Sequence, residues 1–334
     1  MASLTKTKDA NMASIQKSPK FKITMFKKYF KTIFASILSL FLFNTANAQK
    51  ESPVAKSVLW EISGKDIKTS YLFGTIHLIP KDDFLLDDPT KKSFDAAEQV
   101  VFEIDMKTLE NPMALMGMMG KMMMSGDTTI KDLISDADYK LLKVRMDSLG
   151  IPLEMMQSIK PMFLSTMLDG AGAGFGGMDD ANSETAKTTG FEIEFNKMAK
   201  SKNKSTSGLE TIDFQMSLFD SIPLKVQADM LVASLKTKNS GKEEFQEMVK
   251  LYLNKDIEKM SGMLSSESSD KSMAPYEAMM LNNRNANWIS KMEKLMRDKS
   301  NFFAVGAAHL GGVKGVLNLL KLKGYTVKPL QGRA

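Results

Sequence analysis

The pattern of apolar and polar positions predicts a series of short strands from residue 57 onward. Two apolar segments, Ser57–Ile62 and Thr69–Ile76, flank a Ser-Gly-Lys-Asp turn and predict a β-hairpin. Gln99–Asp105 is an apolar run that ends in carboxylates, which is typical of a buried parallel strand. Two further strands are expected at residues 302–305 and 325–329.

Helical spacing dominates between these strands. Apolar residues recur at intervals of three and four along most of residues 106–300, which predicts a large helical insertion. Within it, the polar residues 202–207 are interpreted as a solvated link. Short strands separated by helices indicate an α/β protein, bordering on α+β, with a mostly parallel central sheet covered by helices. We expect residues 49–334 to form a single domain, with about 106–300 as a helical cap.

Two segments of the insertion have an unusual composition. Residues 106–124 hold eight methionines, whose thioethers are soft-metal ligands. Because no histidine or cysteine lies nearby to complete a copper site, we favour a flexible apolar helix that fills gaps or lines a groove. Residues 169–182 are rich in glycine but lack the other residues of a phosphate-binding loop, so they predict a mobile loop beside a site.

The first 48 residues have the features of a secretory signal peptide. Lysines 27, 28 and 31 precede the apolar run Ile33–Phe43, and Ala46-Asn47-Ala48 follows as a small-x-small cleavage pattern. Met25 is a second candidate for the start of the chain. The run is short for a membrane-spanning helix, although an uncleaved anchor is the alternative and would associate the protein with a membrane. We expect export, to the periplasm or the cell exterior.

Charge and cysteine content narrow the classes of partner and site. The formal net charge is +6, but residues 1–48 contain eight lysines and one aspartate, so the remaining chain has a net charge of −1. A basic surface for nucleic acid is therefore not expected, and nucleic acid is excluded as a partner. The chain has no cysteine, which excludes thiolate metal sites and cysteine nucleophiles.

The only two histidines, His77 and His309, end the same local pattern: an apolar strand followed by Gly-x-x-His. Glycine lets the backbone turn where the strand ends, which brings the histidine to the edge of the sheet where α/β proteins bind ligands. Two imidazoles can supply half of the inner shell of a metal ion, and carboxylates can complete it. We favour a metal site; a pair that grips substrate and an acid–base pair without metal are the alternatives.

Charged residues near predicted strand ends are candidates to complete the site. Glu103 lies in an apolar run, where an unpaired charge would be costly. Glu192 and Glu210 stand near the starts of helices, where capping or solvation is the simpler role. Arg284 lies in the helix before the second histidine strand, and it could pair with Glu103, hold a substrate carboxylate, or form only a surface salt bridge.

Motifs that recur along the chain in a fixed order resemble those of the TraB/GumN family, which includes the Tiki metalloproteases. They span residues 57–330, nearly all of the chain after the leader. The resemblance implies a fold related to the ChaN and erythromycin-esterase types. The motifs are Leu59-Trp60, Ser70–His77, Phe102–Asp105, Gly190–Glu192, Gly208–Thr211 with Gln215, Arg284-Asn285 with Trp288, Val305–Leu310 with Gly312 and Gly315, and Gly324–Val327.

The resemblance also implies a divalent metal, with manganese, cobalt or zinc as the candidates. His77 and His309 match the paired histidines of the family, and Glu103 matches a family acid. Glu192 stands where many relatives carry aspartate. We therefore expect these four side chains to hold the metal.

The activity implied by the resemblance is hydrolysis of a peptide or protein substrate. Glu103 or Glu210 is expected to act as the general base, and Arg284, which matches the family arginine, to stabilise oxyanion charge or hold a substrate carboxylate. The alternative is a non-catalytic extracytoplasmic protein that sequesters a peptide or signalling molecule. Iron or haem handling is a third hypothesis, suggested only by the ChaN likeness.

Overall fold

The computed structural model describes residues 55–168, 187–236, 240–263 and 274–331. The chain divides into two units at Pro53, and the fold below is that of the second unit. The predicted signal peptide and the glycine-rich segment 169–182 lie outside the described residues. Among the described residues, no helix has both the length and the apolar character needed to cross a bilayer.

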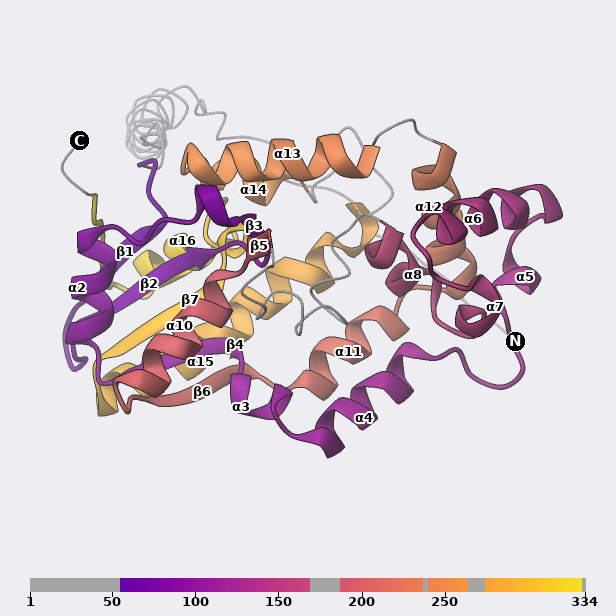
Figure 1. Cartoon of the computed structure of the whole chain (residues 1–334). Helices are drawn as coiled ribbons and strands as arrows, with labels where there is room; N and C mark the ends of the chain where they lie inside the picture. The colour runs from indigo at the N-terminus through magenta and orange to yellow at the C-terminus, as the bar shows by residue number, and fades with distance from the viewer. Residues whose placement is uncertain (1–54, 169–186, 237–239, 264–273, 332–334) are drawn as a thin grey trace, which may run out of the picture. The chain divides into compact units, whose positions relative to one another are not determined.

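A six-stranded sheet forms the centre of the second unit, in the order β6-β4-β7-β2-β1-β8 (Figure 1). The pairs β6–β4, β4–β7 and β7–β2 are parallel, whereas β1 pairs antiparallel with both β2 and β8. The predicted hairpin and the mostly parallel sheet are therefore confirmed. The strands are β1 Leu59–Ser63, β2 Ser70–Thr75, β4 Gln99–Ile104, β6 Ser205–Glu210, β7 Asn301–Gly306 and β8 Thr326–Pro329.

Position in the sheet explains the composition of each strand. β4 and β7 lie in the interior of the sheet, and both read as nearly continuous apolar runs with buried residues on both faces. β6 lies at the edge, where polar residues are tolerated, and its sequence is STSGLE. The prediction of a solvated link at residues 202–207 is wrong from Ser205 onward, because an edge strand needs no apolar pattern.

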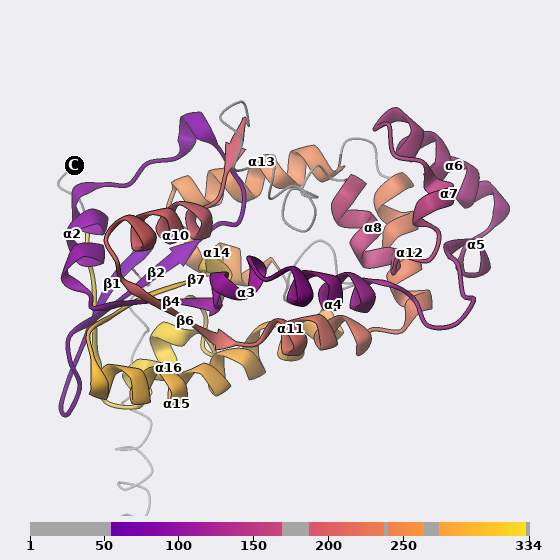
Figure 2. The same ribbon diagram turned by 60° about the horizontal axis from the view of Figure 1, so that its bottom comes forward.

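Helices cover both faces of the sheet. Figures 1 and 2 show α2 and α10 on one face and α15 and α16 on the other. Phe94, Phe195 and Phe302 pack against one another on the first face, with ring centroids 4.9–5.6 Å apart. The elements around the sheet are β3 Ile79–Pro80, η1 Lys81–Asp83, α2 Asp88–Ala96, β5 Thr188–Thr189, α10 Phe191–Ser201, α13 Ser240–Leu253, α14 Ile257–Gly262, η3 Ala274–Tyr276, the π-helical turn η4 Ala278–Asn282, α15 Asn283–Asp298, η5 Ala307–His309 and α16 Val316–Leu322.

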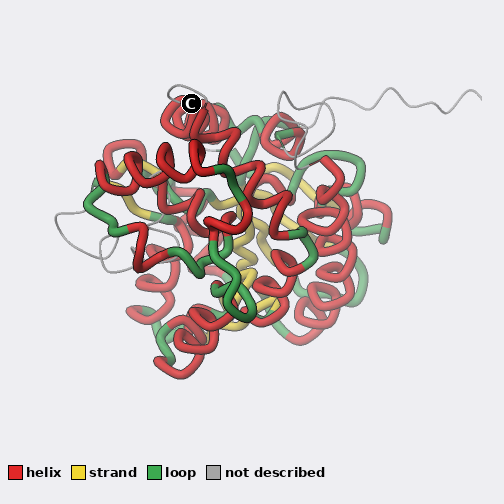
Figure 3. The backbone as a smooth tube through the Cα atoms, turned by 90° about the vertical axis from the view of Figure 1, so that its right-hand side faces the viewer, coloured by secondary structure: helices red, strands yellow, loops and turns green. Residues whose placement is uncertain are grey.

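The remaining helices of the insertion have a hydrophobic core of their own, centred on Phe163, Leu142 and Leu231. Figure 3 is turned so that the right-hand side of Figure 1 faces the viewer, and it shows helices in front of the strands. The predicted large helical insertion between the two Gly-x-x-His strands is confirmed, and it also contributes β5 and β6. Its other helices are α3 Met106–Leu109, α4 Pro112–Met122, α5 Ile130–Leu133, α6 Asp136–Ser148, α7 Leu153–Met156, α8 Pro161–Leu168, α11 Ile212–Asp220 and α12 Leu224–Lys236.

Candidate functional site

The candidate residues lie where four neighbouring parallel strands end. Thr75 at the end of β2 is paired with Gly306 at the end of β7. In the same way, Ile104 at the end of β4 is paired with Glu210 at the end of β6. The carboxyl ends of parallel strands meet at one edge, which is where open α/β sheets place their ligands. His77 and His309 follow β2 and β7 within three residues, so the sheet brings both Gly-x-x-His motifs to this edge.

His309 is buried and has a defined tautomer. Its Nδ1 lies 2.6 Å from Oδ1 of Asn285, and the Nδ2 of Asn285 donates to the carbonyl oxygen of Lys314 at 2.9 Å. Because this second bond orients the amide, Oδ1 must accept, and the proton of His309 is assigned to Nδ1. The lone pair on Nε2 then faces Nη1 of Arg284, 3.2 Å away.

Burial also favours the neutral form of His309. The loss of hydration and the guanidinium of Arg284 lower the pKa of His309 to about 3, against the opposing effect of Glu103. The imidazole packs 4.4 Å, centroid to centroid, from the ring of Trp288. A neutral imidazole with a fixed tautomer is the form in which histidine binds metals.

Arg284 joins the two acids at the ends of β4 and β6. Its Nη2 donates to Oε2 of Glu103 at 2.6 Å and to Oε2 of Glu210 at 2.8 Å, while Nε donates to both oxygens of Glu210. Nε2 of Gln215 donates to the same two acids at 3.1 and 3.0 Å. Three of the predicted catalytic residues therefore form one buried, hydrogen-bonded cluster.

Glu103 remains ionised in this cluster. Burial alone would raise its pKa, but the neighbouring His309 ring, the guanidinium of Arg284 and the backbone N–H of Gly306 hold the pKa well below its ordinary range. The Gly306 N–H donates to Oε1 of Glu103 at 2.8 Å. The same Oε1 lies 3.8 Å from Nε2 of His309, so acid and imidazole face a common space.

His77 forms a second pair with Glu192. Nδ1 of His77 lies 2.8 Å from Oε1 of Glu192, and Oγ1 of Thr75 donates to that oxygen at 2.6 Å. The His77 side chain is 72% exposed, so its Nε2 edge is accessible from solvent. The carboxylate of Glu192 raises the pKa of His77 to about 9.

Gly190 allows this second pair to form. It precedes α10, and a Cβ at this position would overlap the carbonyl oxygen of His77. The close approach of the two backbones brings the first turn of α10, with Glu192, against the segment that follows β2. Glycine is required at position 190 because a side chain would clash with His77. Its backbone conformation is extended, not left-handed, and would by itself allow any residue.

The structure thus arranges the six predicted side chains as two groups. Glu103, Glu210, Arg284 and His309 form one group, and His77 with Glu192 forms the other. The groups interact, since the charge of His77 affects the pKa of both Glu103 and His309. In the described part of the chain, no three histidine, aspartate or glutamate side chains form a ready-made metal-binding group.

Three residues of the site were absent from the predicted set. Thr75 and Gln215 donate hydrogen bonds to its acids, and Asn285 fixes the tautomer of His309. All three stand inside or beside the motifs that carry the family resemblance. Their position in those motifs was the available signal, but uncharged side chains gave no reason to select them.

The donor chemistry fits a divalent cation. Both histidines engage an oxygen through Nδ1, so Nε2 is the ring nitrogen that would face a cation; metal-binding histidines generally show this arrangement. The ionised Glu103 supplies an oxygen beside His309. Arg284 contacts Nε2 of His309, so the guanidinium must withdraw from that atom before a cation can bind there.

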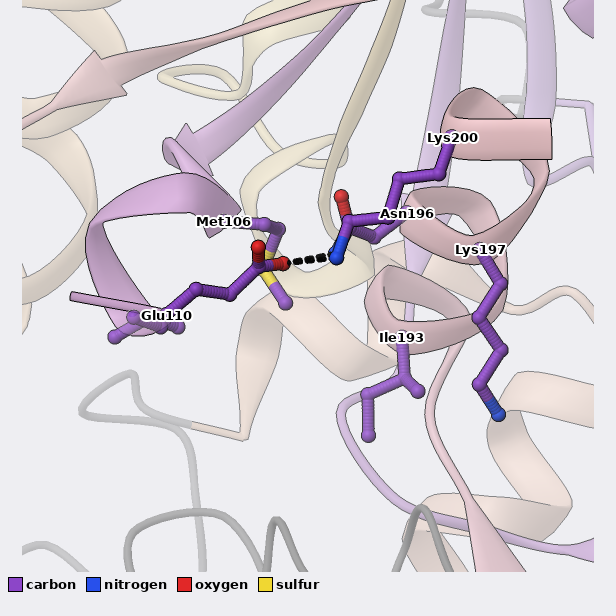
Figure 4. Close-up of a pocket in the computed structure, with 7 residues that line it drawn as sticks. Met106, Glu110, Ile193, Asn196, Lys197 and Lys200 are labelled. Atoms are coloured by element: carbon purple, nitrogen blue, oxygen red, sulfur yellow. Dashed lines mark hydrogen bonds and ion pairs between the residues drawn. The ribbon is translucent and has the colours of Figure 1, made fainter. Parts of the chain in front are cut away.

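A small cavity lies between α3 and α10 (Figure 4). Its volume is about 230 Å³, and its walls include the apolar side chains of Met106, Leu109 and Ile193. Asn196 also lines it and donates through Nδ2 to Glu110 at 3.1 Å. The two helices that form the cavity begin directly after Asp105 and Gly190, close in sequence to Glu103 and Glu192.

The fold and this edge of the sheet define an α/β protein with paired Gly-x-x-His motifs at neighbouring parallel strands. The model of the TraB/PrgY/gumN family matches residues 58–329. The chain therefore belongs to the TraB/PrgY/gumN family. Searches of curated proteins and of solved structures found no match.

Proposed function

We propose that the protein is a metal-dependent hydrolase that acts on peptide bonds outside the cytoplasm. The observation that carries the proposal is the state of the two histidines, each engaged through Nδ1 and next to an ionised acid. A divalent cation such as manganese, cobalt or zinc would, when bound, make a water molecule more acidic and polarise a scissile carbonyl. His77, His309 and Glu103 are the proposed ligands.

Glu192, which the sequence predicted as a further ligand, is instead proposed to position His77. Its Oε1 already accepts from Thr75 and contacts Nδ1 of His77. A carboxylate in this position fixes the ring orientation and increases the basicity of the other nitrogen. Thr75, at the end of β2, in turn holds the carboxylate.

Arg284 is proposed to bind negative charge on the substrate. The guanidinium is held by Glu103 and Glu210 at the same edge of the sheet as the histidines. From there it can face a substrate carboxylate or the oxygen that gains charge during peptide hydrolysis. Glu103 is the acid nearest His309 and keeps its proposed role as a ligand, whereas Glu210 holds the arginine in place.

Peptide cleavage can be tested directly. The purified chain is incubated with a defined peptide mixture and each of the three metals, and new peptide termini are identified by mass spectrometry. Glu103→Gln should abolish cleavage. Glu98→Gln, directly before β4 and at the opposite end of the strand from Glu103, should leave cleavage intact. Cleavage that survives in Glu103→Gln would contradict the role given to this acid.

Sequestration without turnover is the second candidate. It is favoured by the internal pairing of Arg284, whose ion pairs with Glu103 and Glu210 already satisfy the charged centre of the site. In that case the metal-loaded protein would retain peptides by ultrafiltration and release them intact after denaturation.

A further inference from the structure

The methionine-rich segment has two different faces in the structure. Met118 and Met122 of α4 are buried in the core of the helical insertion, as a gap-filling role requires. Four other methionines of the segment are exposed. They are Met113, Met116, Met119 and Met123, with exposed fractions of 74%, 68%, 64% and 42%.

The four exposed methionines share one side of α4. Their spacing is three, three and four residues, and residues at these intervals are neighbours on a helix, with Cβ atoms about 5–6 Å apart. A methionine side chain is unbranched and flexible, so neighbouring sulfur atoms can turn toward a common point. Met116 and Met119 lie on α4 and Met123 directly follows its last residue, so the three side chains can converge in this way.

The other residues of α4 add little bulk or charge to this surface. Gly120 lies between Met116 and Met123 on the helix, and a Cβ placed at Gly120 would meet no atom within 4 Å. Lys121 is the charged residue of α4, and its Nζ pairs with Asp213 on α11 at 2.8 Å. Figure 2 shows α4 lying along α11, which leaves the other side of α4 uncovered by that helix. A cation at the thioethers would therefore meet no side chain at Gly120 and no unpaired lysine on α4.

We infer that the exposed thioethers of Met116, Met119 and Met123 form a binding site for a soft monovalent cation, Cu(I) or Ag(I), with Met113 as an adjacent donor. Thioether sulfur is a soft ligand that selects Cu(I) over the hard and borderline divalent ions. The sequence favoured an apolar helix that fills gaps or lines a groove, because histidine and cysteine are absent nearby. The exposure of these side chains removes the gap-filling role for them. This site is separate from the proposed hydrolytic site and does not depend on it.

Silver is the suitable probe because Ag(I) needs no reductant. The purified chain, labelled with ¹³C at the methionine methyl groups, is titrated with silver nitrate in chloride-free buffer. The methyl signals of Met116, Met119 and Met123 should shift together and saturate at one equivalent. Binding of Ag(I) by His77 would shift other signals and would not account for these changes.

Matched leucine variants test the assignment. Met116→Leu with Met119→Leu conserves volume at exposed positions, and it should weaken Ag(I) binding on the order of tenfold or more. Met155→Leu, which removes an equally exposed methionine on α7, should leave binding unchanged. Circular dichroism checks that each variant remains folded. Methyl signals that do not shift, or equal affinity in the double variant and the Met155→Leu control, would overturn the inference.

Discussion

Nη1 of Arg284 lies 3.2 Å from Nε2 of His309, the ring nitrogen that would coordinate a cation. The Nδ1 of the same ring is already committed to Asn285, so Arg284 occupies the one lone pair that the imidazole offers. The positively charged guanidinium therefore contacts His309, Glu103 and Glu210 and takes the place that a bound cation would have. Cation binding and this contact exclude each other, which links the position of Arg284 to the state of the site.

Removal of Arg284 should strongly destabilise the fold. Arg284→Met leaves Glu103 and Glu210 buried without their cation, and breaking a buried pair in this way costs about 3–5 kcal/mol. The free energy of unfolding from urea denaturation measures the effect. Arg297→Met, on the exposed side of α15, should change it by less than about 0.5 kcal/mol. Equal effects of the two substitutions would show that the buried cluster contributes little.

Asn285 should control the tautomer of His309. Asn285→Leu removes the acceptor on Nδ1, and the loss of such an outer partner typically weakens metal binding about 10- to 100-fold. Asn285→Asp retains an oxygen acceptor and should preserve the tautomer. The ¹⁵N shifts of the His309 ring report the position of the proton. An unchanged ring spectrum in Asn285→Leu would contradict the assignment.

His77 should titrate well above the ordinary range for histidine. The carboxylate of Glu192 raises the pKa of His77 to about 9, so the charged pair is complete below pH 6.5. Its contribution to stability is then lost as the pH rises through about 9. Because a cation competes with this proton, apparent metal affinity should increase with pH over the same interval.

Glu192→Gln should move both effects to lower pH by removing the charge that stabilises the imidazolium. NMR titration of the His77 ring in the wild-type and variant proteins measures the shift. Lys197→Gln, farther along the same helix, provides the control. A His77 midpoint that is the same in Glu192→Gln as in the wild type would refute the pairing.

Gly190 should not tolerate a side chain. Gly190→Ala places a methyl group against the His77 carbonyl, and relief of such overpacking typically costs about 1–3 kcal/mol. Gly117→Ala has open space around the new methyl group within α4 and should stabilise the helix by about 0.5–1 kcal/mol. Thermal unfolding distinguishes the two. A neutral Gly190→Ala substitution would mean that the two backbones can separate freely.

The sequence predicted the elements that have a strong pattern. β2 and β7 are apolar runs that each lead into Gly-x-x-His. This repetition predicted that both histidines lie at the edge of the sheet where the parallel strands end. Glu103 was selected for the same reason, since a carboxylate inside an apolar run requires partners. The structure provides them in Arg284, Gln215 and the Gly306 N–H.

Other features depended on contacts that no local pattern encodes. β6 is polar because it lies at the edge of the sheet, so it was interpreted as a link. The tautomer of His309 is set by Asn285, which is 24 residues away and belongs to another element. The exposure of Met116 and Met119 could not be predicted either, because methionine occurs on both the buried and the exposed faces of helices.

Metal content is the most direct test of the central claim that one cation binds at the two Gly-x-x-His motifs. The purified chain is dialysed against manganese, cobalt and zinc in turn and analysed by inductively coupled plasma mass spectrometry. We expect close to one equivalent of the preferred metal in the wild type and in Glu98→Gln, and essentially none in a folded His77→Ala/His309→Ala variant. The same metal content in all three proteins would contradict the account.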